Sequence, residues 1–569
     1  MELTVPSSVP EAASRPRRVL YFGPSPARFA ELVEQMSTSV GAPLTWPDGE
    51  AALDCGGAQT RWLPTYEPEA TMVQLQDSYV SLLLLDLRLA PGVPPRLIDE
   101  ARRLLALLDD PVDIEARYGF HRILALVSGR EAEDVDALMV ELGGKGVEQV
   151  MRQRGEPVAF AGRVLNRACE LMVGGSAGRT ALCAAGGGIT GIYFEQGAIK
   201  CLDDCLPGGA LRNFDMYFGI SAGAVVTSVL RVGYSVDEFM AAIAGVEGGR
   251  IAPLNLSLVR LGHLNVPDIK RRLRLGAGAA ARGARDILLR RGRLDADAVF
   301  LGITALVGAP FHSDRFGEIL HDVFTGAGAT NDFRDLQSAL YIGASDQDTK
   351  RHVVFGVEDR DEVPIHLAVQ ASLSINPAFS AVAIDGRYYE DGAVTQTSNF
   401  TEAIRRGADL VFSLDPFVPY VSREAGSVNA RGVLYNIDQD VRSLSFTRFQ
   451  RTRDWALRQH PSVSSYTFLP SNRTRRLLSM NPMDHRPYLP IWKGAYLSTL
   501  ARIQTLSHRL RGDLHAHGIK LDTARAEAVA ARLEATEQPG FADFYPDGRP
   551  EIPRPPLSRP AAGATSGAL

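Results

Sequence analysis

Cysteine is scarce in this chain, with 5 among 569 residues. An odd and sparse count argues against a disulfide framework and favours a reducing compartment. Cys201 and Cys205 lie about one helical turn apart, but no second cysteine or histidine cluster would complete a zinc site. We therefore interpret both as small buried residues and expect neither a metal nor a cofactor.

Long apolar runs and a charge excess are also missing. No stretch approaches the roughly 18–20 apolar residues of a membrane span, and residues 1–17, a flexible lead, lack the apolar core of a secretory signal. A net charge of −5 argues against general nucleic-acid binding. The apolar share of 45% is ordinary for a globular protein, and the length suits two or three domains. We expect a cytoplasmic protein.

Short apolar runs alternate with helical patterns over residues 18–174, which predicts a small α/β domain with parallel strands. The run that ends at Asp86 resembles the phosphoacceptor strand of response-regulator receivers, a flavodoxin-like fold, and Ser128 matches their switch position. Gly23-Pro24-Ser25 stands where receivers carry an acidic pair, so the Mg²⁺ site for phosphoryl transfer is missing. We interpret Asp86 as a degenerate phosphoacceptor, or as a residue that ends a strand, in a domain that could contact a protein partner.

Three consecutive glycines, Gly186, Gly187 and Gly188, separate an apolar run from a helical pattern. Such a loop exposes backbone N–H groups and suits either a phosphate or an oxyanion. With Gly191, the spacing fits a dinucleotide-binding loop, but no acidic residue closes a second strand about 20 residues later. An oxyanion loop is therefore the better interpretation.

A second turn, Gly219-Ile220-Ser221-Ala222-Gly223, has the Gly-x-Ser-x-Gly spacing of a nucleophile elbow. A serine on a sharp turn between a strand and a helix needs small neighbours, here Gly219 and Gly223. The pattern alone is weak, because small residues surround a serine in many loops. Together with the glycine loop, it predicts an acyl-transfer site with Ser221 as the nucleophile.

Two Asp-Gly pairs follow far downstream, within residues 385–394. Asp385-Gly386 lies between apolar and tyrosine-rich residues and suits the turn of a hairpin. Asp391-Gly392 is followed by Ala393 and Val394.

In this order, the three motifs resemble the patatin-like phospholipase family over residues 178–455, with further similarity at 341–356 and 371–379. The resemblance implies a three-layer α/β/α core and a dyad of Ser221 and Asp391. It also implies an oxyanion hole built by Gly186, Gly187 and Gly188. Thr190 is a departure, because the family often carries arginine or lysine there, which implies altered headgroup or oxyanion electrostatics.

The predicted function is hydrolysis of a phospholipid or another lipid ester without a cofactor. A carboxylate is a weak base at its usual pKa of about 4, so we expect burial to raise the pKa of Asp391. Two alternatives remain open: a silent lipid-binding scaffold, and an α/β-hydrolase with a Ser-Asp-His triad.

Basic and apolar residues are combined at 269–274 and 279–293, within an insertion at 231–300. We interpret this insertion either as a helical cap over the site or as a surface for peripheral contact with anionic lipid. A helical extension is expected at 456–539, and a disordered tail at 540–569, where proline, glycine and alanine dominate.

Overall fold

The computed structural model describes residues 17–550 and 552, except 42, 56–57, 90–95, 110–112, 130–131, 174–177, 255–269, 271–312 and 377. The chain divides into two compact units. The first holds residues up to 178 together with 457–464 and 506–517, and the second holds 179–456, 465–505 and the residues from 518 onward. Each unit is described by itself.

The first unit is built on a six-stranded sheet of order β2-β3-β1-β4-β5-β6. All neighbours pair in parallel except β2 and β3, which form an antiparallel hairpin. Without β2, this is the flavodoxin-like doubly wound strand order; the narrower receiver resemblance stays a prediction. The strands are β1 (Arg17–Phe22), β2 (Ala51–Cys55), β3 (Ala58–Thr65), β4 (Leu82–Arg88), β5 (Ile123–Ser128) and β6 (Gln149–Arg152).

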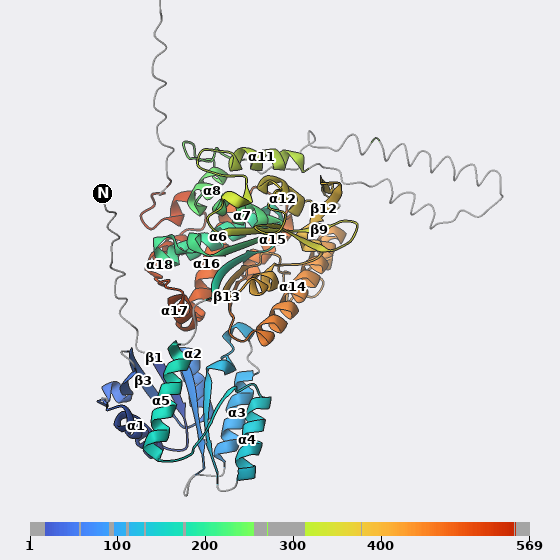
Figure 1. The fold of residues 1–569 in the computed structure, drawn as a ribbon. Helices are drawn as coiled ribbons and strands as arrows, with labels where there is room; N and C mark the ends of the chain where they lie inside the picture. Colours follow the sequence, from blue (N-terminus) through green and yellow to red (C-terminus); the bar gives the residue numbers. More distant parts are fainter. Residues whose placement is uncertain are drawn as a thin grey trace, which may run out of the picture. The chain divides into compact units, whose positions relative to one another are not determined.

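Helices cover both faces of this sheet (Figure 1). Alternate residues of the central strand β4 enter opposite cores, Leu83 and Leu85 on one face and Leu82 and Leu84 on the other. A strand buried on both faces must be apolar throughout, which explains its run of leucines. Helices α2, α3 and α4 pack on the first face, and α1 and α5 on the second. The helices of this unit are α1 (Pro26–Val40), α2 (Pro68–Asp77), α3 (Leu97–Asp109), α4 (Ala132–Gly144), α5 (Pro157–Val173) and α17 (Ser507–Ala516).

Asp86 lies within β4 and has no exposed surface. Arg88 donates to both of its carboxylate oxygens, from Nε and Nη2, at 2.6 Å each, and the Tyr21 hydroxyl donates at 3.0 Å. The buried charge is thus paired and hydrogen-bonded, as burial requires. The phosphoacceptor interpretation stays a prediction, and the structure adds a packing role for this carboxylate.

The sequence favoured a reducing compartment, but Cys169 on α5 is disulfide-bonded. An odd cysteine count argues against a framework of several bridges but does not exclude a single bond. Cys201 and Cys205 are free and fully buried, as the sequence predicted.

The second unit is built on an eight-stranded sheet of order β11-β12-β9-β8-β7-β13-β14, with β10 paired to β9. Strands β13, β7, β8 and β9 are parallel to their neighbours in that order, whereas β10, β11 and β12 pair antiparallel. The strands are β7 (Arg179–Ala184), β8 (Met216–Ile220), β9 (Ala339–Asp346), β10 (His352–Gly356), β11 (Val382–Ile384), β12 (Arg387–Asp391), β13 (Ala408–Leu414) and β14 (Ser464–Phe468).

Helices flank this sheet to complete the α/β architecture that the sequence predicted (Figure 1). Helix α7 packs on β7, β8 and β9, helix α13 packs on β13, and α16 packs along α6. The helices of this unit are α6 (Gly188–Cys205), α7 (Ala222–Arg231), α8 (Val236–Ile243), α11 (Asp314–Phe324), α12 (Ile365–Ser372), α13 (Phe400–Arg405), α14 (Val433–Gln459), α15 (Asn472–Met480), α16 (Tyr488–Thr505) and α18 (Ala524–Glu534).

A buried cluster of charges joins α6 to the later helices of this unit. Lys200 Nζ lies 2.9 Å from Asp204 and 3.2 Å from Asp237. Asp204 also accepts hydrogen bonds from the Tyr496 hydroxyl at 2.8 Å and from Arg525 Nε at 2.9 Å. These contacts satisfy the charges that burial takes out of water.

The C-terminal part of the second unit differs from the sequence prediction in two places. Strand β14 lies within 456–539, where a helical extension was expected, and extends the sheet beyond β13. The tail also begins later than residue 540, because Phe541–Phe544 form a 3₁₀ helix and Phe544 and Tyr545 are buried. Phe544 packs edge-on against Trp492. This aromatic contact holds the segment in place although glycine and proline are frequent around it.

Most of the predicted insertion at 231–300 lies outside the described residues, which include 231–254 and 270 of it. Among the helices of the described ranges, none combines the length and hydropathy that crossing a membrane requires.

Candidate active site

Ser221 occupies a strained turn between β8 and α7. Its φ of 53° and ψ of −119° are rare for a residue with a side chain. The turn is tight, because a Cβ atom at Gly223 would lie 2.2 Å from the carbonyl oxygen of Ala184. The Ser221 N–H donates to Ser372 Oγ at 2.8 Å, and that hydroxyl donates to the Gly343 carbonyl at 2.6 Å. These bonds hold the strained backbone in place.

The glycine loop lies beside this turn, because β7 and β8 are parallel neighbours and Ala184 is in register with Gly219. A Cβ atom at Gly186 would lie 3.2 Å from Ser221 Cβ. Gly187 caps the N-terminus of α6, and Gly188 has a φ of 65°. Within the described part of the chain, the N–H groups of Gly187 and Gly188 have no hydrogen-bond acceptor. They are free to donate to an oxyanion, together with the positive end of the helix dipole.

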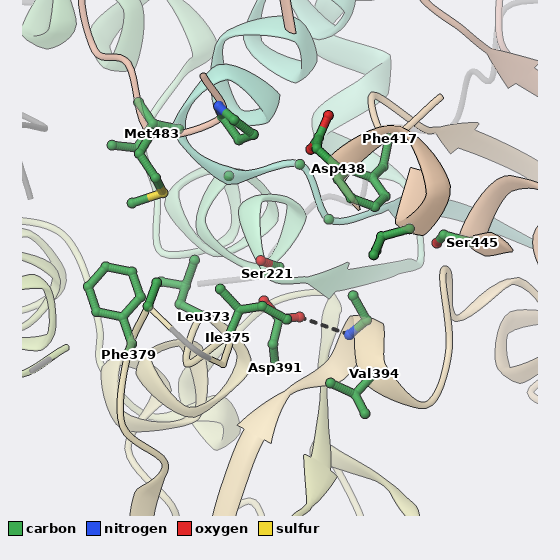
Figure 2. Close-up of a pocket in the computed structure, with 18 of the residues that line it drawn as sticks. Ser221, Leu373, Ile375, Phe379, Asp391, Val394, Phe417, Asp438, Ser445 and Met483 are labelled. Atoms are coloured by element: carbon green, nitrogen blue, oxygen red, sulfur yellow. Dashed lines mark hydrogen bonds between the residues drawn. The ribbon is translucent and has the colours of Figure 1, made fainter. Parts of the chain in front are cut away.

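Asp391 reaches the same edge of the sheet by an antiparallel strand. It ends β12 and is in register with Ala344 of β9, while Gly343 of β9 is in register with Ile220 of β8. Ser345 Oγ donates to the Asp391 carbonyl at 2.9 Å, and the Ala393 N–H donates to Asp391 Oδ1 at 2.8 Å. Figure 2 shows the side chains of Ser221 and Asp391 facing one another.

Burial raises the pKa of Asp391 from 3.8 to about 6. Hydrogen bonds from the Ser221 side chain and from the Ala393 N–H oppose this rise in pKa, because they stabilise the charged form. The predicted desolvation is confirmed. Such a carboxylate is a better base than an exposed one and is still ionised near neutral pH. Asp385 lies instead in the exposed turn of the β11–β12 hairpin, with a φ of 49°.

Ser221 and Asp391 open into a cavity of about 700 Å³ (Figure 2). Its walls are mostly apolar, and Leu373, Ile375 and Phe379 lie on one side, with Phe417 opposite (Figure 2). No histidine is among the described residues that line it. The geometry therefore gives no support to a Ser-Asp-His triad. The lining residues are Gly186, Gly187, Gly188, Ile189, Ile192, Ser221, Ser313, Phe316, Leu373, Ile375, Ala378, Phe379, Asp391, Ala393, Val394, Thr397, Phe417, Asp438, Val441, Leu444, Ser445, Arg448, Pro482 and Met483.

Residues 182–404 match the patatin-like phospholipase family. This is a family of lipid acyl hydrolases, and the matched segment includes the glycine loop, the Ser221 turn and Asp391. No curated protein matches the sequence. Among solved structures, VipD from Legionella pneumophila is similar over 63% of this chain and 75% of that chain, at 12% sequence identity. Its TM-score is 0.26, which is too low to establish a shared fold.

Thr190, which the sequence analysis singled out as a departure from the patatin-like pattern, lies behind the glycine loop. Thr190 is fully buried, and its hydroxyl donates weakly to the carbonyls of Gly187 and Leu478, at 3.4 Å each. A neutral side chain so placed stabilises the loop but brings no charge to the cavity.

Several residues of the patatin-like site were missed by the sequence analysis. Ser372 and Ser345 hold the backbones of Ser221 and Asp391, yet a buried serine carries no local signature. One cavity wall comes from α14, which contributes Asp438, Val441, Leu444, Ser445 and Arg448. In the described ranges, no cluster of three or more histidine, cysteine, aspartate or glutamate residues is arranged to hold a metal ion.

Proposed function

We propose that this protein is a serine acyl hydrolase that cleaves a carboxylic ester of a lipid with Ser221 and Asp391. One observation carries the proposal: a buried carboxylate with a raised pKa faces a serine on a strained turn, in a largely apolar cavity. The patatin-like match supports the reaction class.

In the proposed mechanism, Ser221 Oγ attacks the ester carbonyl and its proton passes to the Asp391 carboxylate. The oxyanion of the tetrahedral intermediate accepts hydrogen bonds from the N–H groups of Gly187 and Gly188. When the intermediate collapses, the leaving alcohol takes the proton from Asp391. Water then attacks the acyl-enzyme, and Asp391 again accepts and returns a proton.

The shape and surroundings of the cavity favour a lipid. Its volume of about 700 Å³ falls in the range typical of small-molecule sites, and its lining suits acyl chains. Three lining side chains are also exposed to solvent: Val394 by 42%, Val441 by 48% and Leu444 by 74%. Exposed apolar side chains at a cavity rim suit contact with the lipid aggregate that holds the substrate.

Labelling with a fluorophosphonate probe tests the proposal, because such probes react with activated serines. The unmodified protein should label, whereas Ser221→Ala and Asp391→Asn should lose labelling and ester hydrolysis. Asp385→Asn is the matched control, since Asp385 lies in an exposed hairpin turn. Labelling that persists in Ser221→Ala, or equal losses in both aspartate variants, would refute the assignment.

A further inference from the structure

Arg448 is the one positively charged residue among the described residues that line the catalytic cavity. It lies on α14 and is partly buried. Its guanidinium donates to the carbonyls of Ala393 at 2.7 Å and Val394 at 3.1 Å. It also donates to Thr397 Oγ1, from Nη2 at 3.1 Å and from Nε at 3.2 Å. All of these acceptors are neutral.

No carboxylate within the described ranges balances this charge. Burial lowers the pKa of Arg448, and no acidic neighbour opposes that change. Arg442 on the same helix shows the contrast: it is fully buried and pairs with Asp438 at 2.8 Å. Asp438, the other acid besides Asp391 among the described lining residues, is therefore already paired with a cation. A partly desolvated cation without a counter-ion is costly, and an anionic ligand would relieve that cost.

The guanidinium lies close to the reacting groups. Ala393, whose carbonyl accepts from Arg448, donates its own N–H to Asp391 Oδ1 at 2.8 Å. A Cβ atom at Gly186 would lie 3.5 Å from Ala393 Cβ and 3.2 Å from Ser221 Cβ. Arg448 is thus separated from the Ser221–Asp391 pair by a single residue of the cavity wall.

We propose that Arg448 is a specificity-determining residue that binds the phosphate of a glycerophospholipid while the scissile ester lies at Ser221. The inference rests on the proposed function and adds the part of the substrate that this side chain selects. Guanidinium groups bind phosphate oxygens by charge-assisted hydrogen bonds, which are stronger than neutral ones. The glycine loop supplies no charge of its own, because Thr190 is neutral and buried.

Substitutions on α14 can separate this binding role from support of the loop at 393–397. Arg448→Gln removes the charge but keeps an N–H donor at the position of Nε, which contacts Thr397 Oγ1, and Arg448→Lys keeps the charge. Arg451→Gln is the matched control, because it removes the same charge from an exposed position of the same helix that does not line the cavity.

Steady-state kinetics on mixed micelles should compare phosphatidylcholine with a diacylglycerol of the same acyl chains. For Arg448→Gln, kcat/KM on phosphatidylcholine should fall about tenfold or more, chiefly through KM, while diacylglycerol changes less than about threefold. A tenfold loss corresponds to ~1.4 kcal/mol. Arg448→Lys should retain part of the preference, and Arg451→Gln should retain all of it.

Equal losses on both lipids would overturn the inference, because they would show that Arg448 only supports the loop. The inference would also be overturned if the ratio of kcat/KM on phosphatidylcholine to kcat/KM on diacylglycerol were the same in Arg448→Gln as in the unmodified protein. In both cases the unmodified protein would still label and hydrolyse ester, so the proposed function would survive. If the unmodified protein neither labels nor hydrolyses any ester, the proposed function fails and the inference fails with it.

Discussion

The reactivity of Ser221 should depend on pH through the buried carboxylate of Asp391. With a pKa of about 6, roughly one tenth of the molecules carry ionised Asp391 at about pH 5, and roughly nine tenths at about pH 7. The rate of serine labelling should therefore rise about tenfold between these pH values. With the ordinary aspartate pKa of 3.8, the same interval would change the rate by less than about a tenth.

The assay is the second-order rate of fluorophosphonate labelling from about pH 4.5 to about pH 8, at constant ionic strength. The unmodified protein and Asp385→Asn should share a midpoint near pH 6. Folding at each pH is checked by circular dichroism, so that a lost native state is not mistaken for a lost base. A midpoint near pH 4, or a flat profile, would refute the argument that burial of Asp391 activates the serine.

Three further predictions concern stability. The pKa of Asp391 in the folded state exceeds its unfolded value of 3.8. The protonated carboxyl of Asp391 therefore contributes its full stability below about pH 4, and this contribution is lost as pH rises through about 6. Asp391→Asn should hence be up to ~3 kcal/mol more stable than the unmodified protein at about pH 8 in urea unfolding, and equal at about pH 4; lower stability at every pH would contradict this. Lys200→Met removes the cation that Asp204 and Asp237 share, leaving Asp204 with Arg525 alone, and should cost about 3–5 kcal/mol in the same assay; a loss below about 1 kcal/mol would contradict it. Gly223→Ala places a Cβ 2.2 Å from the Ala184 oxygen and should lower the melting temperature and abolish labelling, and full labelling would disprove the close approach.

The turns around Ser221 and Gly186–Gly188 could be predicted because their chemistry is local. A tight turn leaves no room for Cβ atoms, so the glycines that permit it are visible in the sequence. Asp385-Gly386 was separable from Asp391 by another local signal, since its flanking residues describe a hairpin. The predicted role of Asp391 came from the resemblance, because its contact with Ser221 depends on the order of strands in the sheet.

Residues that act through tertiary packing could not be predicted in this way. Arg448 lies on a long helix whose periodic pattern shows no sign that one face lines a cavity. Strand β14 was missed because it joins the sheet after the long helix α14. Phe544 was assigned to a tail because glycine and proline dominate the surrounding composition, although its ring packs against Trp492. In each case the deciding partner is distant in sequence.

Ser221 and Asp391 lie at the ends of strands β8 and β12, which flank β9, so the sheet itself positions the proposed reacting pair. Both groups are fixed by backbone pairing and by the hydroxyls of Ser372 and Ser345, whereas one wall of the cavity comes from α14. The α14 side chains that line the cavity lie outside the strands that carry Ser221 and Asp391. If the proposed function holds, substrate preference could be redesigned by changing this one helix face while the strands that carry Ser221 and Asp391 are left intact.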